Sequence, residues 1–122
     1  MIKVLIADDH PLLRQGLKLI LEETEDIRVA EEASDGEEVL DRLKNNSFDV
    51  MVLDINMPKK SGFEVLEELK ARGNTIPVLI LSTYSEDEYI DLAIKKGAAG
   101  YLTKEQAPEK LIDAIRDVFI NK

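Results

Sequence analysis

Four apolar stretches of the sequence end in polar residues whose types are suited to chemistry. The most apolar of them, residues 50–53, is followed directly by Asp54. The other three lead into Asp8 and Asp9, into Ser82 and Thr83, and into Lys104. Short apolar runs of this kind predict strands buried on both faces, as in a parallel sheet covered by helices. Because the carboxyl ends of parallel strands meet at one edge of the sheet, these side chains are candidates for a single site.

The three carboxylates of Asp8, Asp9 and Asp54 predict a metal site. Crowded carboxylates either raise one another's pKa values or bind a cation. Mg²⁺ prefers oxygen ligands and keeps several waters, which suits a site with one or two direct carboxylates. The chain has no cysteine, and its one histidine, His10, stands beside Pro11 at a helix start, where we interpret it as a local packing residue. We therefore expect Mg²⁺, with Mn²⁺ as a substitute, rather than zinc.

A carboxylate nucleophile beside a metal indicates phosphoryl transfer. Asp54 would accept the phosphoryl group as an aspartyl phosphate. Lys104 would neutralise one phosphoryl oxygen, and Ser82 would hydrogen-bond another. Each residue taken alone has a structural alternative as a helix cap, a turn residue or a solvated charge, so only the complete set is specific.

The elements that would hold these side chains alternate in kind along the chain. Strands are expected at residues 2–7, 27–30, 50–54, 77–81 and 98–102. Amphipathic helices should follow them, beginning near Pro11, Ser34, Ser61, Ser85 and Pro108. Five such units predict an α/β, flavodoxin-like (βα)5 fold, with a doubly wound five-stranded parallel sheet in the order 2-1-3-4-5 and helices on both faces.

The same spacing predicts how several of these helices begin and end. Ser34, Ser61 and Ser85 each precede a glutamate by three residues, which is the spacing of a capping box. Gly73 and Gly97 stand where the third and fourth helices should stop. The fourth helix is expected to bury Ile90, Ala93 and Ile94.

Length and charge limit the function further. With 122 residues the chain suits one domain. Its formal net charge of -9, from 25 acidic and 16 basic residues, disfavours direct binding of DNA or anionic lipid. No apolar run approaches the roughly 20 residues that cross a bilayer, and no signal peptide precedes the first strand. We expect a cytoplasmic protein that does not bind membranes.

The whole chain resembles the receiver domain of two-component response regulators. The residues that carry the resemblance are Asp8, Asp9, Asp54, Met57, Pro58, Gly62, Ser82, Gly97, Ala98, Tyr101 and Lys104. The resemblance implies that Asp54 is phosphorylated by a sensor histidine kinase and that the chain is a signalling switch of two-component signal transduction, not an enzyme beyond its own phosphotransfer and autodephosphorylation. It also implies that Asp9, Asp54 and the backbone carbonyl of Asn56 hold Mg²⁺, with Asp8 beside them.

Other residues are similar to those of the NarL/FixJ (LuxR-type) subfamily. They are Asp8 to Pro11, Arg14, Gly16, Leu17 and the pair Lys104 and Glu105. This likeness implies a transcription regulator with a C-terminal helix-turn-helix domain through which DNA would be bound. We expect residues 1–122 to form the receiver domain alone, with any such output domain outside this chain. Whether the chain is a stand-alone receiver or part of a longer regulator is left open by the sequence.

Three other functions compete with this interpretation. A metal-dependent hydrolase of the haloacid-dehalogenase type also uses an aspartate nucleophile, but it needs a second aspartate two residues later, where this chain has Asn56. An interaction module that works without phosphorylation would have lost residues of the acidic pocket, and here the set is complete. Nucleotide binding is disfavoured because no glycine-rich phosphate loop follows the first strand.

Resemblance and position together predict a conformational switch and a dimer interface. Ser82 should move toward the phosphoryl group, with Tyr101 rotating inward to fill the vacated space. Tyr84 should overhang the pocket and slow hydrolysis, or else be a surface aromatic without kinetic effect. Activation should promote a homodimer through flanks of the first and last helices, formed by Leu12, Leu19, Ile112 and Phe119. The alternative is that these two flanks face each other within one chain.

Overall fold

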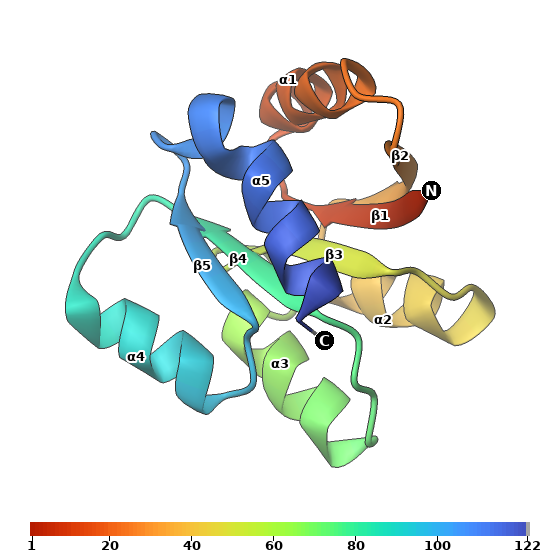
Figure 1. Cartoon of the computed structure of the whole chain (residues 1–122). Helices are drawn as coiled ribbons and strands as arrows, with labels where there is room; N and C mark the ends of the chain where they lie inside the picture. Colours follow the sequence, from red (N-terminus) through yellow and green to blue (C-terminus); the bar gives the residue numbers. More distant parts are fainter. Residues whose placement is uncertain (122) are drawn as a thin grey trace.

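The chain folds into a five-stranded parallel sheet with helices on both of its faces. The computed structural model describes residues 1–121. Its elements in chain order are β1 (Ile2–Ala7), α1 (Pro11–Glu22), β2 (Ile27–Ala33), α2 (Gly36–Asn45), β3 (Val50–Asp54), α3 (Gly62–Ala71), β4 (Val78–Ser82), α4 (Asp87–Lys95), β5 (Gly100–Thr103) and α5 (Ala107–Ile120) (Figure 1). The strands are ordered β2-β1-β3-β4-β5, so the predicted architecture and strand order are confirmed.

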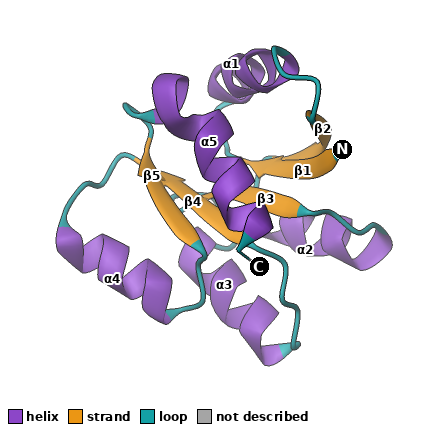
Figure 2. Cartoon of the chain, in the orientation of Figure 1, coloured by secondary structure: helices purple, strands orange, loops and turns teal. Residues whose placement is uncertain are grey.

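Two hydrophobic layers separate the sheet from its helices. On one face α1 and α5 cover the strands, and on the other face α2 and α3 cover them, with α4 beside β5 (Figure 2). Successive side chains of β3 point to opposite faces of the sheet. Val50 and Val52 pack under α1 and α5, whereas Met51 and Leu53 pack under the helices of the other face. This alternation explains why β3 is apolar throughout, since both of its faces are buried.

The helix caps agree with the sequence in part. At α3 the predicted capping box forms, with the Ser61 side chain accepting from the Glu64 backbone N–H and the Glu64 side chain accepting from that of Ser61. The prediction for α2 is wrong by one residue, because Asp35 is the cap and accepts from the Glu38 N–H. Ser34 and Asp35 are both suitable cap residues, and each has a glutamate three residues later, so the sequence allows the helix to begin at either of two positions. In the structure Asp35 is the cap and Gly36 is the first helical residue.

The fourth helix differs from the prediction at both its cap and its core face. It begins after Glu86, which makes no side-chain cap, so the predicted capping box at Ser85 is wrong. Its core face is centred on Ala93, which is fully buried, whereas Ile94, predicted to be inward, is 49% exposed. Successive helix residues are turned by about 100°, so Ile94 cannot share the narrow face that Ala93 turns to the sheet. Gly97 ends this helix region with φ 110° and Gly73 follows α3 with φ 68°, as predicted.

Strand β2 is longer than predicted and extends through Glu31 and Glu32. Its pairing with β1 shifts by one residue between Val4 and Leu5, which is the mark of a β-bulge. Both glutamates are half-buried and paired with arginines, Glu31 with Arg42 and Glu32 with Arg14. The extension brings Glu32 beside the carboxyl end of β1, next to the candidate site. Within residues 1–121 no helix is both long and apolar enough to cross a membrane.

Candidate functional site

The predicted site residues meet at the carboxyl edge of the sheet. Asp54 is the last residue of β3, Ser82 is the last residue of β4, and Asp8 follows β1. The strand register pairs Ala7 with Leu53, so the residues that end β1 and β3 lie side by side at the point where the strand order reverses. Asp8, Asp54 and Ser82 are all buried, with 1%, 2% and 0% of their surfaces exposed. Polar groups buried at one edge of a sheet form a site rather than a solvated surface.

Lys104 reaches this edge from the turn after β5. Its Nζ lies 3.3 Å from Asp54 Oδ2 and 3.1 Å from Asp8 Oδ2. Its backbone N–H donates to the Ser82 carbonyl at 2.8 Å, which fixes the start of its side chain beside β4. Burial alone would lower the pKa of Lys104, but the two carboxylates outweigh it and raise that pKa above its ordinary value. Lys104 is therefore a fixed positive charge at neutral pH.

The surroundings of Asp54 make its charged form less favourable than that of a solvated aspartate. Burial raises the pKa of Asp54, the charge of Asp8 raises it further, and the attraction of Lys104 opposes both. The Asn56 backbone N–H donates to Asp54 Oδ1 at 3.3 Å. The sequence-based expectation that crowded carboxylates perturb one another is thus met at Asp54.

The donor set of the site fits a divalent cation. Asp8 Oδ2 and Asp9 Oδ1 are buried and accept no hydrogen bond within the described chain. Asp8 Oδ2 has only its ion-pair contact with Lys104, and Asp9 Oδ1 lies 3.1 Å from the His10 ring. Lys104 contacts Asp8 and Asp54, whereas Asp9 lies beside the His10 ring. Buried anionic oxygens of this kind are the ligands that Mg²⁺ prefers. The part assigned to the Asn56 carbonyl stays a prediction.

Backbone contacts on both sides of the site hold the segments that carry Asp8 and Asp54. The guanidinium of Arg14, on α1, donates to the Asp8 carbonyl and pairs with Glu32 on β2, the Nε to Oε1 distance being 3.2 Å. After β3, the Gly62 N–H donates to the Ile55 carbonyl at 2.8 Å. A Cβ on Gly62 would lie 2.4 Å from the Asp54 carbonyl oxygen, so only glycine allows this close approach.

The loop after β4 links Ser82 to two tyrosines. The Tyr84 N–H donates to Ser82 Oγ at 3.0 Å, and the Tyr101 hydroxyl donates to the Tyr84 carbonyl at 2.6 Å. The Tyr84 hydroxyl accepts from the Asn56 side chain at 3.0 Å, two residues beyond Asp54. The Tyr84 ring also stacks on Tyr89, with ring centroids 4.3 Å apart. Tyr84 thus bridges the β3 and β4 loops beside the site, while its effect on hydrolysis remains a prediction.

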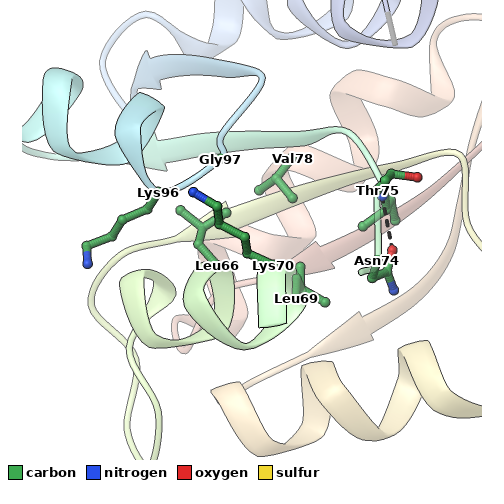
Figure 3. Close-up of a pocket in the computed structure, with 9 residues that line it drawn as sticks. Leu66, Leu69, Lys70, Asn74, Thr75, Val78, Lys96 and Gly97 are labelled. Carbon is green, nitrogen blue, oxygen red and sulfur yellow. Dashed lines mark hydrogen bonds between the residues drawn. The ribbon is translucent and has the colours of Figure 1, made fainter. Parts of the chain in front are cut away.

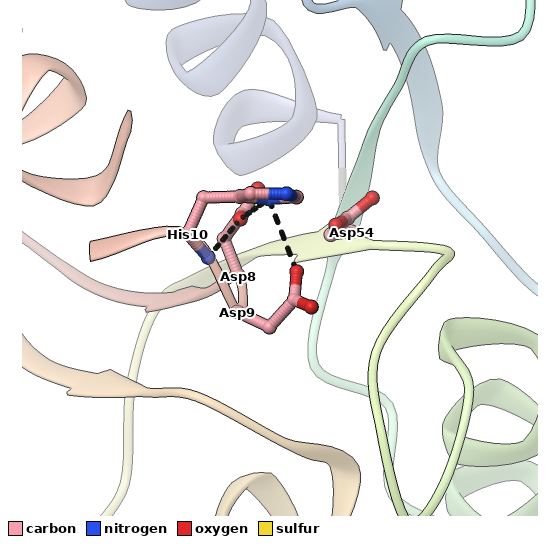
Figure 4. Close-up of side chains that lie close together, drawn as sticks. All are labelled: Asp8, Asp9, His10 and Asp54. Atoms are coloured by element: carbon pink, nitrogen blue, oxygen red, sulfur yellow. Dashed lines mark hydrogen bonds and ion pairs between the residues drawn. The ribbon is translucent and has the colours of Figure 1, made fainter. Parts of the chain in front are cut away.

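Sequence reasoning missed three contacts of the site. His10 was expected to pack locally, but its ring Nδ1 lies 2.9 Å from Asp8 Oδ1 (Figure 4). The clamp made by Arg14 and the contact between Asn56 and Tyr84 were not predicted either. A signal existed only for His10, as a potential ligand directly beside two aspartates. Contacts between side chains on different loops depend on rotamers that a linear pattern does not contain.

The residues predicted to form a dimer interface have unequal surroundings. Leu12 and Leu19 on α1 are 81% and 63% exposed. Ile112 and Phe119 on α5 are half-buried and pack against the core layer under α1 and α5. The interface remains a prediction, and its exposed part lies on α1.

A surface pocket of about 300 Å³ lies away from these residues (Figure 3). It lies between the second half of α3, the residues that lead into β4, and the end of α4. Its lining includes Leu69, Lys70, Asn74 and Lys96. Because it opens near the start of β4, whereas Ser82 ends that strand, it is separate from the acidic site.

Comparison with known proteins decides the family. The sequence model of the response regulator receiver domain family matches residues 4–116. The chain belongs to this family. Receiver domains are the regulated modules of two-component signalling, so the predicted resemblance and the predicted class of function are confirmed.

Relatives of this receiver domain include transcription regulators from several bacteria. It is 38% identical over 115 residues to the transcriptional regulatory protein YxjL of Bacillus subtilis, covering 94% of this chain and 53% of that protein. It is 36% identical over 119 residues to the response regulator UvrY of Escherichia coli, covering 98% of this chain and 55% of that protein. The nitrate/nitrite response regulator NarL of E. coli is 37% identical over 112 residues, which cover 92% of this chain and 52% of that protein. The chain therefore spans about half the length of these relatives.

Solved receiver domains have the same fold. The receiver domain of a Francisella response regulator superposes with a TM-score of 0.92 at 33% identity, covering 99% of this chain and 98% of that one. The signal receiver domain of a NarL response regulator from Mycobacterium tuberculosis superposes with a TM-score of 0.93 at 30% identity. The match covers 99% of this chain and 98% of that one. The flavodoxin-like arrangement inferred from the sequence is thus shared with these two domains.

Proposed function

We propose that this receiver domain accepts a phosphoryl group on Asp54 from the phosphohistidine of a sensor histidine kinase. In this step the bond between phosphorus and the imidazole nitrogen breaks, and a bond forms between phosphorus and a carboxylate oxygen of Asp54. The observation that supports the proposal is the burial of Asp54 at the end of β3, with Lys104 Nζ 3.3 Å from its Oδ2. A buried carboxylate beside a fixed cation has the surroundings that an acceptor of a negatively charged phosphoryl group needs.

The other residues of the site have separate roles in this proposal. Lys104 stays protonated because its pKa is raised, and it would pair with one phosphoryl oxygen. Ser82 would donate its hydroxyl hydrogen to another oxygen. Asp9, Asp54 and the Asn56 carbonyl would hold Mg²⁺ or Mn²⁺, with Asp8 beside them. When bound, the cation would offset negative charge on the phosphoryl oxygens.

A change at Ser82 would reach the surface through the loop after β4. Ser82 Oγ accepts from the Tyr84 N–H, and the Tyr84 carbonyl accepts from the Tyr101 hydroxyl. If Ser82 turns toward a phosphoryl group, the Tyr84 backbone loses this partner and the position of Tyr101 is no longer fixed. Crystals with and without beryllofluoride test the coupling: different positions of Tyr101 support it, and one rotamer in both refutes it.

The output we propose is a transcriptional response controlled by dimerisation. Three relatives are transcription or response regulators about twice as long as this chain, which supports residues 1–122 being the receiver domain of a regulator that contacts DNA through a separate helix-turn-helix domain. Regulators of transcription act where the DNA is, in the bacterial cytoplasm. Phosphorylation would favour a homodimer through Leu12, Leu19, Ile112 and Phe119.

Phosphorylation by a small donor tests this function without the cognate kinase. The protein is incubated with acetyl phosphate and Mg²⁺, and its intact mass is measured. One phosphoryl adduct is expected for the wild type and none for Asp54→Asn. Asp41→Asn, on the exposed surface of α2, is the matched control and should be phosphorylated like the wild type. An adduct that persists in Asp54→Asn contradicts the proposal.

A further inference from the structure

The single histidine of the chain faces the acidic site rather than the core. His10 directly precedes α1 as its N-cap residue, but its side chain makes no cap hydrogen bond. Instead its ring Nδ1 lies 2.9 Å from Asp8 Oδ1 and 3.1 Å from Asp9 Oδ1 (Figure 4). The His10 N–H also donates to Asp8 Oδ1 at 2.8 Å, which ties its backbone to the same carboxylate. These three contacts hold His10 beside the aspartates, with 63% of its side chain exposed.

These atoms lie close enough together to surround one ion after small side-chain movements. One ligand atom from each of Asp8, Asp9, His10 and Asp54 lies within 4.8 Å of the others. With bonds of about 2.1 Å, neighbouring ligands of an octahedral ion are about 3 Å apart and opposite ones about 4.2 Å. The distances of 2.9 and 3.1 Å from Nδ1 to the two carboxylate oxygens match neighbouring positions.

A second observation indicates that this cluster is built to take a cation. Asp8 is 1% exposed, and its Oδ2 accepts no hydrogen bond within the described chain. Asp9 Oδ1, which the imidazole approaches, likewise accepts none. Buried anionic oxygens without hydrogen bonds are unfavourable unless a positive charge approaches them, and Lys104 contacts only one of these two oxygens.

We propose that His10 Nδ1 is an additional metal ligand that makes this acidic site favour imidazole-binding transition ions. Neutral imidazole suits ions such as Co²⁺ and Ni²⁺, whereas Mg²⁺ prefers oxygen and gains little from a ring nitrogen. The inference rests on the proposed metal-dependent function of Asp54 and adds to it the class of ion that the site selects. Phosphorylation of Asp54 would then be supported by these ions at lower concentrations than by Mg²⁺.

Metal titrations of variants at this one position test the proposal. Ni²⁺ and Mg²⁺ are titrated calorimetrically into tag-free wild type, His10→Ala and His10→Asn. The asparagine keeps an N–H donor near Nδ1 but removes the imidazole, so it separates hydrogen bonding from metal binding. For both variants the dissociation constant for Ni²⁺ should rise at least about tenfold, while that for Mg²⁺ changes by less than about twofold.

A spectroscopic measurement identifies the ligand directly. Pulsed electron paramagnetic resonance of the Mn²⁺-loaded wild type should show coupling to an imidazole nitrogen. Because the chain has one histidine, this signal can come only from His10 and should vanish in His10→Ala. Asp9→Asn should lower the affinity for both Ni²⁺ and Mg²⁺, and this result would locate both ions at this site.

The possible results separate this inference from the proposed function. If His10→Ala and His10→Asn leave the ratio of Ni²⁺ to Mg²⁺ affinity unchanged and no nitrogen coupling appears, His10 is only a hydrogen-bond donor and the inference is overturned, even though Asp54 is phosphorylated. If nickel binding survives Asp9→Asn, the ion lies elsewhere and the inference also fails. A wild type that acetyl phosphate and Mg²⁺ leave unmodified overturns the proposed function instead.

Discussion

Replacing Lys104 by methionine should destabilise the domain because two buried carboxylates would lose their shared cation. The Lys104 side chain is 15% exposed, and its Nζ lies 3.3 Å from Asp54 Oδ2 and 3.1 Å from Asp8 Oδ2. At an effective dielectric constant of about 20, each contact corresponds to roughly 5 kcal/mol of direct attraction. The cost of burying the lysine charge offsets part of this. Removing one partner of a buried ion pair typically costs about 3 to 5 kcal/mol, which is our expectation for Lys104→Met at pH 7 without metal.

The pH dependence of this effect has a defined sign. The pKa of Asp54 is already raised in the wild type, by burial first and by Asp8 second, and loss of Lys104 should raise it further. A carboxyl group with a raised pKa contributes most to stability below its unfolded pKa, and that contribution is lost as the pH rises through its folded pKa. The deficit of Lys104→Met should therefore shrink on acidification from pH 7.

Urea denaturation followed by circular dichroism measures these changes. Wild type, Lys104→Met and the exposed control Lys110→Met are compared at pH 7 and pH 5 in a chelator and again with Mg²⁺. Lys110→Met should stay within about 0.5 kcal/mol of the wild type. Addition of Asp54→Asn to Lys104→Met should restore part of the lost stability. A Lys104→Met protein as stable as the control, or one whose deficit grows on acidification, would refute the electrostatic account.

Three further predictions concern the loop after β3, the tyrosine bridge and the exposed face of α1. Gly62→Ala should cost about 1 to 3 kcal/mol in urea denaturation because its Cβ meets a carbonyl oxygen at 2.4 Å, whereas Gly16→Ala, with open space around it, should stabilise α1 by about 0.5 to 1 kcal/mol. Equal effects would show that the close approach is unimportant. Tyr84→Ala should speed phosphoryl loss at least about twofold by opening the site to water, and an unchanged rate supports a surface role. Leu19→Lys should weaken a beryllofluoride-induced dimer at least about tenfold in light scattering, and an unaffected dimer excludes this face.

The main elements of the fold follow from local patterns in the sequence. Strand β3 is apolar at every position up to Asp54 because both faces of the sheet are covered, and that continuity identifies it as a central strand. The position of Asp54 and Ser82 follows from the same reasoning, since strand ends in a parallel sheet share an edge. These inferences depend on periodicity, which a sequence contains directly.

The finer contacts of the site could not be inferred in this way. The α2 cap at Asp35 rather than Ser34 depends on which of two adjacent side chains accepts from the first backbone N–H groups of the helix. The hydrogen bond between Asn56 and Tyr84 joins loops 28 residues apart, and the turn of the His10 ring over two aspartates depends on a rotamer. Each is a choice between states of similar local energy that packing in three dimensions decides.

Chemical trapping of the phosphorylated residue tests the central claim most directly. The protein is treated with acetyl phosphate and Mg²⁺ and then reduced with borohydride, which converts an aspartyl phosphate into homoserine, and the peptides are sequenced by mass spectrometry. Homoserine at position 54 alone is the result predicted here. Homoserine at Asp8 or Asp9, or a phosphoryl group retained on His10, would contradict the assignment of Asp54 as the phosphoacceptor.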